Sequence, residues 1–394
     1  MRFGIAYGAD AVYMAGTRFG MRAAATNFDD NALREGIAYA HAHGVKCYIT
    51  VNIMPSNRDL PALPAYLELL QDAGADALII ADVGVLRMAR RYAPKVPVHI
   101  STQTSILNHE AANYWADEGA ERIVLARELS LEEIAEIRAK TPKELEIEAF
   151  VHGAMCISYS GRCLISQYMT GRDANHGACA QPCRWNYSLM EEKRPGEFFP
   201  VEEDGRGTYL YNSKDMCMIE HVPELIEAGI TSFKIEGRNK TAYYAACVTG
   251  AYRAAIDTYK KDPESFVLPQ FCRDEVNKVS HREYYTGFYF GNQENGQHYG
   301  DSQYIREYEV VGMPVECDDS GKAVFALKNR FFDGEELELI QPGQAPYVFR
   351  AENVTDDEGT KRELFNVPQM RVHFAFPFKV SEWAILRKVK ERPE

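Results

Sequence analysis

Residues 73–82 read AGADALIIAD, in which a glycine flanked by small residues is followed by a short apolar run ending in an acid. Residues 7–16 repeat the phrase as YGADAVYMAG. We interpret the glycine as the left-handed end of a helix and the apolar run as a strand buried on both faces. Related segments occur at residues 43–52, 96–102, 118–127, 145–153 and 228–237.

Amphipathic stretches separate these segments, for example at residues 31–43 and 63–73, and Asp29 or Asp30 and Ser130 are suitable N-caps. Alternating strands and helices with short connections predict a parallel sheet with right-handed crossovers. The seven segments are one strand short of a (β/α)₈ barrel. Since Met1 lies in what reads as the end of a helix, we expect a TIM-type (β/α) barrel lacking its first strand. A doubly wound open sheet is the alternative, although no glycine-rich dinucleotide motif supports it.

Polar residues lie at or just beyond the ends of the predicted strands, where catalytic residues of such barrels are found. They are Asn52, Asp82, His99, Ser101, Thr102, Gln103, Arg127, Glu128, His152, Glu236 and Arg238. Any one of them could simply cap a helix or bond to a loop. Their convergence at one end of a barrel would instead form an active-site rim.

Three further segments complete the predicted organisation. The barrel is assigned to residues 1–261 and contains an insertion at 152–217, which is too long for an ordinary strand–helix loop. A linker follows at 262–302. Residues 303–394 contain short alternating strands with Asp, Gly and Pro turns, which predict a small antiparallel β-barrel.

The insertion holds five of the nine cysteines, namely Cys156, Cys163, Cys179, Cys183 and Cys217. Thiolates gathered in this way are typical of a soft metal centre. Only Cys179 and Cys183 have the close spacing of a zinc-ribbon pair, so dispersed cysteines suit an iron–sulfur cluster somewhat better. On spacing alone a cluster, zinc, and structural or redox thiols all remain open.

Composition narrows the class of protein. No run of about 18 apolar residues occurs, so we expect no membrane span. The N-terminus does not resemble a secretory signal and the cysteine count is odd, which favours a reducing cytoplasm. The net charge of −13 argues against non-specific coating of nucleic acid but leaves room for a local basic groove.

Several motifs together resemble the collagenase-like U32 peptidase family over nearly the whole chain. The most specific is EAFVHGAMCISYSGRCLISQYMTGRDANHGACAQPCRWNY at residues 148–187. It is joined by NSKDMC at 212–217 and FKIEGRNKTAYYAACVTGAYR at 233–253. Other matching phrases are GADAVYMAG at 8–16, FGMRAAATNF at 19–28, HISTQTSILN at 99–108 and RIVLARELS at 122–130. The tail from about Gln303 is similar to the small β-domain of members that hydroxylate tRNA.

The resemblance implies oxygen-independent hydroxylation. Members similar to this chain form 5-hydroxyuridine at the tRNA wobble position with prephenate as hydroxyl donor, and relatives hydroxylate an rRNA cytidine or ubiquinone precursors. They carry a [4Fe–4S] cluster on four cysteines. By motif the ligands here are Cys156, Cys163, Cys179 and Cys217, with Cys183 as the alternate. A homologous partner subunit is a further possibility.

Roles for the rim residues follow as hypotheses. Arg127, Lys234 and Arg238 are suited to holding the donor's carboxylates, and Asn52 and Gln103 to binding substrate. Proton transfer is assigned to three residues, His99, His152 and Glu236. The aromatic candidates for stacking on a flipped base are Tyr159, Tyr168 and Trp185.

The family name also points to proteolysis. The chain contains neither H-E-x-x-H nor G-x-S-x-G. A Cys156 nucleophile beside His152 is conceivable, but service as a metal ligand would remove Cys156 from that role. Hydroxylation is therefore the favoured activity and peptidase the alternative.

Overall fold

The computed structural model describes residues 1–21, 27–156, 158, 163, 165–185, 189–190, 198–199, 214–238, 240–291 and 304–390. The chain divides into two compact units. The sheet unit consists of Asp10–Asn239 and Arg282–Gln303, and the second unit of Met1–Ala9, Lys240–His281 and Tyr304–Glu394. None of the helices in the described ranges is both long and apolar enough to cross a bilayer.

The sheet unit confirms all seven predicted strands. They are β1 (Ala11–Met14), β2 (Lys46–Val51), β3 (Ala77–Ile80), β4 (Val98–Ile100), β5 (Arg122–Val124), β6 (Glu146–Ala154) and β10 (Ser232–Ile235). They pair in parallel and in chain order, with β10 beside β6. The sheet continues through β9 (Asp215–Cys217), antiparallel to β6, to β11 (Tyr284–Tyr285).

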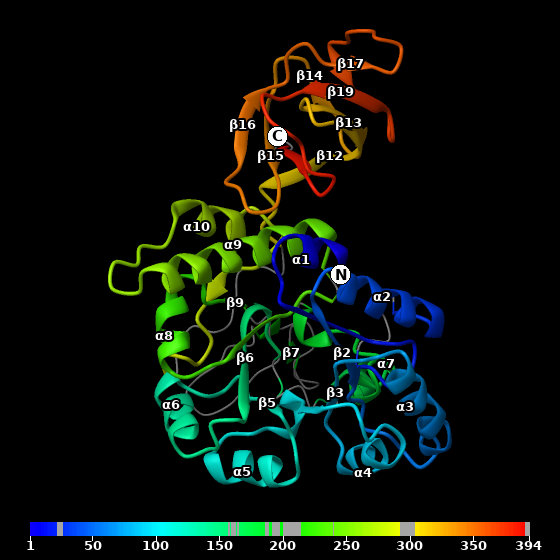
Figure 1. Cartoon of the computed structure of the whole chain (residues 1–394), viewed down its shortest axis with the longest axis vertical. Coiled ribbons are helices and arrows are strands. Elements are labelled where there is room, and N and C mark those ends of the chain that lie inside the picture. Colours follow the sequence, from blue (N-terminus) through cyan, green and yellow to red (C-terminus); the bar gives the residue numbers. More distant parts are fainter. Residues whose placement is uncertain are drawn as a thin grey trace. The chain divides into compact units, whose positions relative to one another are not determined.

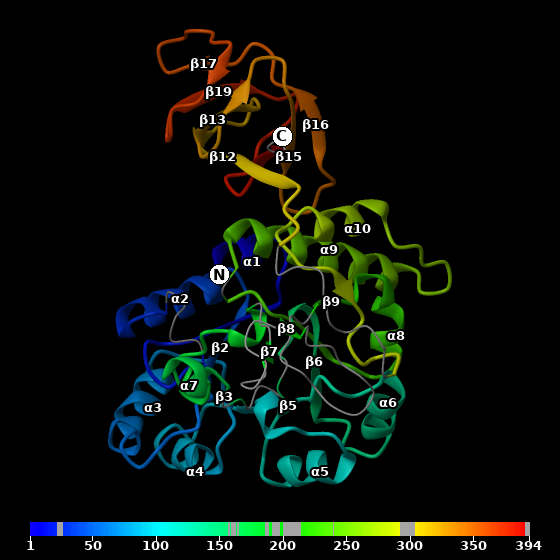
Figure 2. The same cartoon turned by 180° about the vertical axis from the view of Figure 1, so that it is seen from behind.

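Helices surround these strands in the sheet unit, as Figures 1 and 2 show. They are α2 (Asp30–Ala42), α3 (Leu63–Asp72), α4 (Val83–Tyr92), α5 (His109–Asp117), α6 (Leu131–Ala139) and α8 (Val222–Glu227). The predicted glycine caps are confirmed, since Gly74 and its counterparts in the other repeats have positive φ. Asp29 caps α2 and Ser130 forms a capping box with Glu133. The Cys-rich segment adds α7 (Ile165–Thr170) and a ladder of β7 (Leu189–Met190) with β8 (Phe198–Phe199).

The strand order is that of a (β/α) barrel, but a closed TIM-type barrel is not confirmed. In the described part of the chain no ladder joins β1 to β10. The side chain of Tyr13 spans this gap instead, since its hydroxyl donates to the carbonyl of Ile235 (3.3 Å) and to Oε2 of Glu236 (3.2 Å). The two edge strands are therefore linked through a side chain.

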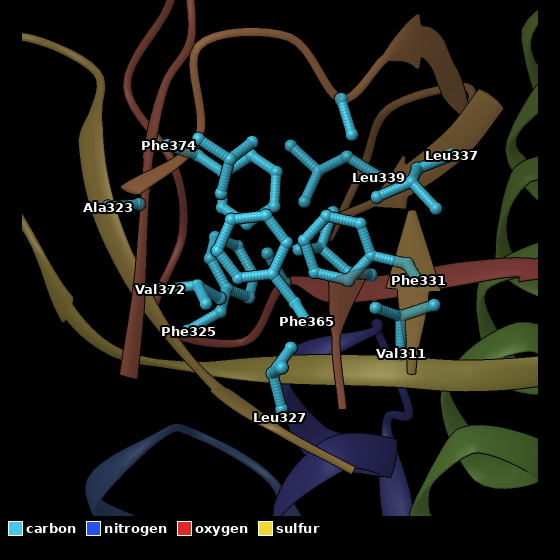
Figure 3. Packing of buried hydrophobic residues seen from close by; sticks show 14 of the residues in the cluster. Val311, Ala323, Phe325, Leu327, Phe331, Leu337, Leu339, Phe365, Val372 and Phe374 are labelled. Atoms are coloured by element: carbon cyan, nitrogen blue, oxygen red, sulfur yellow. The ribbon is translucent and has the colours of Figure 1, made fainter. Parts of the chain in front are cut away.

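The second unit pairs three helices with an antiparallel sheet. The helices are α1 (Arg2–Ala6), α9 (Ala242–Lys261) and α10 (Gln270–Asn277). The sheet has the order β16 (Tyr347–Arg350), β15 (Glu336–Ile340), β20 (Ile385–Val389), β12 (Tyr308–Cys317), β13 (Lys322–Leu327), β19 (Arg371–Ala375), β17 (Thr355–Asp356). It forms a half-barrel, and β14 (Phe331–Phe332) pairs with β18 (Leu364–Phe365). Phe325, Phe331, Phe365 and Phe374 form the centre of its core (Figure 3).

This division groups residues 240–281 differently from the predicted domain boundaries, which stay a prediction. Helix α9 was expected in the barrel domain and α10 in a linker, yet both belong to the unit that contains the half-barrel. The buried guanidinium of Arg387 on β20 donates to Glu275 of α10 (2.6 Å), Glu338 of β15 (2.6 Å) and Tyr243 of α9 (3.2 Å). A fully buried arginine requires such partners, and they join the helices to the sheet.

Candidate functional site

A cavity of about 130 Å³ opens at the carboxyl ends of the parallel strands. Its lining combines residues from all seven strands or their extensions with residues of the Cys-rich segment. Those used below are Tyr13, Asn52, Ser101, Gln103, Arg127, Phe150, Cys156, Cys163, Cys179, Cys183, Lys234, Glu236 and Arg238. Parallel strands bring distant segments to this one edge, as the strand-end argument required.

One side of the cavity carries a polar network between the ends of β2 and β4. The Asn52 amide donates to Oε1 of Gln103 (2.9 Å) and to Oγ of Ser101 (3.3 Å). Gln103 donates back to the carbonyl of Asn52 (2.9 Å). Because these reciprocal bonds orient both amides, Asn52 and Gln103 are suited to presenting fixed polar groups to a ligand.

Glu236 and Arg238 form a charged pair on the β10 side. Oε1 of Glu236 accepts from the backbone N–H of Arg238 (3.2 Å), and Oε2 lies 3.5 Å from the Arg238 guanidinium. That guanidinium also lies 5.2 Å from the centre of the Tyr13 ring. Its Nε and Nη1 are buried and have no hydrogen-bond partner among the described residues. Buried N–H donors of this kind favour an anionic ligand that accepts from them.

Lys234, which lines the cavity, belongs to a buried network of charged side chains. Glu148 accepts from Lys234 (2.5 Å), Arg122 (2.9 Å) and Ser232 (2.8 Å). Burial alone would raise the pKa of Glu148, but the two cations lower it to about 2. Burial lowers the pKa of Lys234. Glu148 raises that pKa and the guanidiniums of Arg238 and Arg122 lower it, and the net shift is downward. The hydrogen bond to Glu148 therefore holds the Lys234 amino group in place at the wall of the cavity.

Sequence reasoning missed Glu148, Arg122 and Tyr13. Glu148 and Arg122 stand within runs that read as buried strands, and a charge inside such a run is a signal because it must find a partner. Tyr13 sits in the first repeat among residues that pack. Nothing in the local pattern distinguishes it from a core aromatic.

Arg127 also lines the cavity, and its guanidinium lies 3.7 Å from the centre of the Phe150 ring. This stacking holds the charged group flat against the wall of the cavity. The structure thus brings six of the eight predicted catalytic and substrate-binding residues to the same cavity, namely Asn52, Gln103, Arg127, Lys234, Glu236 and Arg238.

The two histidines lie elsewhere. His99 is buried behind the cavity, with its ring 4.7 Å from that of Tyr48, and burial together with Arg122 lowers its pKa to about 3. His152 is buried beside β9, and its Nε2 lies 3.3 Å from the hydroxyl of Tyr284. Neither histidine is among the residues that line the cavity. Their assignment to proton transfer stays a prediction.

Four cysteines, Cys156, Cys163, Cys179 and Cys183, line the cavity. Cys217 lies on β9 and pairs with His152 of β6. The thiols of Cys163 and Cys179 each accept from the backbone N–H two residues later, in both cases at 3.3 Å. Hydrogen bonds to the sulfurs are among the features that tune metal–thiolate centres.

The thiols are soft donors and share one cavity, so the donor set fits a metal–sulfur centre in its chemistry. They are not gathered into a finished site, however. Within the described residues, no group of three or more His, Cys, Asp or Glu side chains is close enough to hold an ion. Which four cysteines act together stays a prediction.

Of the predicted stacking residues, Trp185 is 46% exposed next to the Cys-rich lining residues. Tyr159 and the side chain of Tyr168 lie outside the described part of the chain. The stacking role is therefore untested for all three.

Comparison with known proteins gives consistent matches. The family model described as peptidase family U32 matches residues 1–299, and the model of the U32 C-terminal domain matches residues 306–387. The chain is 37% identical over 392 residues to tRNA hydroxylation protein P1 of Bacillus subtilis (strain 168), covering 99% of this chain and 92% of that protein. It is 36% identical to tRNA hydroxylation protein P of Escherichia coli (strain K12), covering 91% and 87%. The 23S rRNA 5-hydroxycytidine C2501 synthase of the same organism is 39% identical, covering 80% of this chain and 46% of that protein.

Proposed function

Because the chain belongs to peptidase family U32, we propose that it is an RNA-modifying enzyme that hydroxylates a pyrimidine base, with the tRNA wobble uridine as substrate and 5-hydroxyuridine as product. Relatives that match along most of the chain are named for tRNA hydroxylation, and another for hydroxycytidine formation in rRNA. The observation that carries the proposal is the cavity, in which the predicted substrate residues and four cysteines meet.

The hydroxyl donor is proposed to be prephenate, a dicarboxylate. Arg127, Lys234 and Arg238 line the cavity, and two nitrogens of Arg238 are buried with no hydrogen-bond partner in the part of the chain that the structure describes. Guanidinium groups pair with carboxylates through parallel hydrogen bonds, so Arg238 is the strongest candidate for a donor carboxylate. Glu236 is held beside it and is the proposed proton-transfer group.

A [4Fe–4S] cluster is proposed on Cys156, Cys163, Cys179 and Cys217, with Cys183 as the alternate ligand. A bound cluster would supply a centre for one-electron transfer beside the substrate. The two backbone N–H bonds to Cys163 and Cys179 support thiolate ligation. Because Cys183 lines the cavity and Cys217 pairs with His152, the fourth ligand must be decided by experiment.

Anaerobic purification tests the cluster. We expect a brown protein with about four iron atoms per chain. Ser variants of Cys156, Cys163 and Cys179 should lose the iron, whereas Cys47→Ser, at a buried thiol outside the cavity, is the matched control. Comparing Cys183→Ser with Cys217→Ser identifies the fourth ligand. A colourless protein with stoichiometric zinc would reject the cluster.

Nucleoside mass spectrometry of tRNA tests the activity. A deletion strain should lack 5-hydroxyuridine-type nucleosides, and prephenate labelled with ¹⁸O in its ring hydroxyl should transfer the label in a reconstituted reaction. Unchanged nucleosides in the deletion strain, together with peptide cleavage that is lost on Cys156→Ala, would favour the peptidase alternative. Activity that appears only when a homologous chain is added would indicate a partner subunit.

A further inference from the structure

We propose that the half-barrel carries a second RNA-binding site, a basic pocket that holds the phosphate backbone of the substrate RNA. The inference rests on the proposed function and extends it to a unit that contains none of the cavity residues. The pocket has a volume of about 380 Å³, within the range of small-ligand sites. Its lining residues are Glu309, Leu327, Lys328, Asn329, Arg330, Asn366, Val367, Pro368 and Lys390.

Two loops form the pocket, and the fold holds both of them in place. Loop 328–330 runs into β14 and loop 366–368 leaves β18, and these two strands pair through Phe331 with Phe365 and Phe332 with Leu364. The rings of Phe331 and Phe365 stack in the core with their centres 4.8 Å apart (Figure 3). The loops are therefore brought together by buried aromatic packing.

Backbone bonds fix the first loop further. The N–H groups of Lys328 and Asn329 donate to the carbonyl of Val311 on β12 (2.7 and 3.2 Å), and the Asn329 amide donates to the carbonyl of Val310 (2.8 Å). Lys390, at the end of β20, donates its N–H to the carbonyl of Glu307 (2.7 Å). The cationic side chains thus extend from a rigid backbone, which lowers the entropy lost when an anion binds.

The pocket is positively charged, whereas the chain as a whole carries a net negative charge. Three cations, Lys328, Arg330 and Lys390, line it with a single carboxylate, Glu309. That carboxylate already lies 3.9 Å from the ammonium of Lys388. In the described ranges neither Lys328 nor Lys390 forms a side-chain ion pair. In a protein of net charge −13, a concave cluster of exposed cations is best explained by a polyanionic partner.

Phosphodiester groups match this pocket better than an isolated small anion does. The cations enter from separate segments, β13–β14 and the end of β20, so they can contact successive phosphates along a strand. Asn366 adds an amide suited to donating to phosphate or ribose oxygens, and Asn329 has a second amide N–H beside the one that it donates to Val310. The pocket would bind RNA without reading its sequence, because it offers charge and amides to the backbone.

Titration of an unmodified tRNA transcript with the full-length protein, followed by fluorescence anisotropy at several salt concentrations, tests the proposal. The variant is Lys328→Gln with Lys390→Gln. The matched control is Lys322→Gln with Lys361→Gln, which removes the same charge from two exposed lysines of the same unit outside the pocket. Since all four lysines are exposed, the variants should fold normally, as thermal melting would verify.

Each phosphate contact contributes about 0.7–0.9 to the slope of log K against log salt, so the pocket variant should lose about 1.4–1.8 of slope and bind roughly 25- to 60-fold more weakly at 0.1 M salt. The control should bind within about twofold of wild type. Equal binding by the two variants overturns the inference. The inference is also overturned if the pocket binds inorganic phosphate but the pocket variant binds tRNA as tightly as wild type does.

The proposed function and the pocket fail in different ways. If the deletion strain lacks the hydroxylated nucleoside but both variants bind tRNA equally, only the pocket is overturned. If the wild-type chain binds no tRNA and the nucleosides of the deletion strain are unchanged, the pocket and the proposed function both fall.

Discussion

Glu148→Gln removes the negative charge that lies between two buried cations, Arg122 and Lys234. The Glu148 side chain is 6% exposed and contacts Arg122 at 2.9 Å and Lys234 at 2.5 Å. A carboxyl whose pKa falls from 4.5 to about 2 contributes about 3 kcal/mol to the free energy of unfolding at neutral pH. Removing one partner of a buried ion pair costs about 3–5 kcal/mol. We therefore expect Glu148→Gln to lower the free energy of unfolding by about 3–5 kcal/mol.

Urea unfolding followed by circular dichroism measures this change. Glu146→Gln is the matched control, since Glu146 accepts from the same Arg122 (2.7 Å) but its side chain is 47% exposed. Exposed ion pairs contribute about 0–1 kcal/mol, so the control should be nearly as stable as wild type. The predicted role of Glu148 is refuted if both variants lose a similar amount of unfolding free energy, or if Glu148→Gln loses less than about 1 kcal/mol. Either result would show that the buried contacts of Glu148 with Lys234 and Arg122 do not stabilise the fold.

Two further predictions concern pH and backbone conformation. Because the pKa of buried His99 is lowered to about 3, the unfolded state binds a proton that the folded state does not, so stability is full above pH 6.5 and declines toward pH 3. Between pH 5 and 6, His99→Gln should reduce the slope of unfolding free energy against pH by about 1.2 kcal/mol per pH unit. An unchanged slope in urea unfolding would contradict a buried neutral imidazole. Gly321→Ala should destabilise the half-barrel by about 3 kcal/mol or more. Gly321 has a φ of +91°, and a Cβ there would collide with the Phe376 carbonyl oxygen and lie 2.6 Å from the Phe378 carbonyl oxygen. Gly343→Ala is the matched control, because Gly343 has a φ of +70° but no atom within 4 Å of the new Cβ, so the loss of stability should be only about 1–2 kcal/mol. Scanning calorimetry measures both variants, and equal losses would contradict the predicted collision at Gly321.

The cavity was predictable in part from the polar residues at the ends of the strands. Six predicted residues, including Asn52, Lys234 and Arg238, line it, because polar residues that follow parallel strands must meet at one edge of the sheet. His99 and His152 do not line it, although they lie on β4 and β6 of the same sheet. His99 is two residues before Ser101 and His152 two residues after Phe150, and both of those residues line the cavity, so alternation along a strand does not separate the histidines from the lining. What separates them is packing, since His99 lies against Tyr48 and His152 beside Tyr284.

The second unit illustrates a different limit. Its antiparallel strands were predictable from alternation and turn residues, and the helical pattern of α9 was also present in the sequence. Their association was not predictable, because it depends on Arg387 meeting Glu275 and Glu338 from segments far apart in the chain. No local sequence pattern indicates partners that are 49 and 112 residues away.

By itself, the sequence determined the seven parallel strands, their glycine-capped helices, the Cys-rich segment and the family, since each depends on local periodicity or on a contiguous motif. Only the tertiary structure decided that Tyr13 bridges β1 and β10, that Glu148 joins Arg122 to Lys234, and that Cys183 faces the cavity while Cys217 pairs with His152. These features depend on strand register and on the packing of distant segments. Register and packing are settled by the burial of the whole core, and the order of residues along any one segment does not contain them.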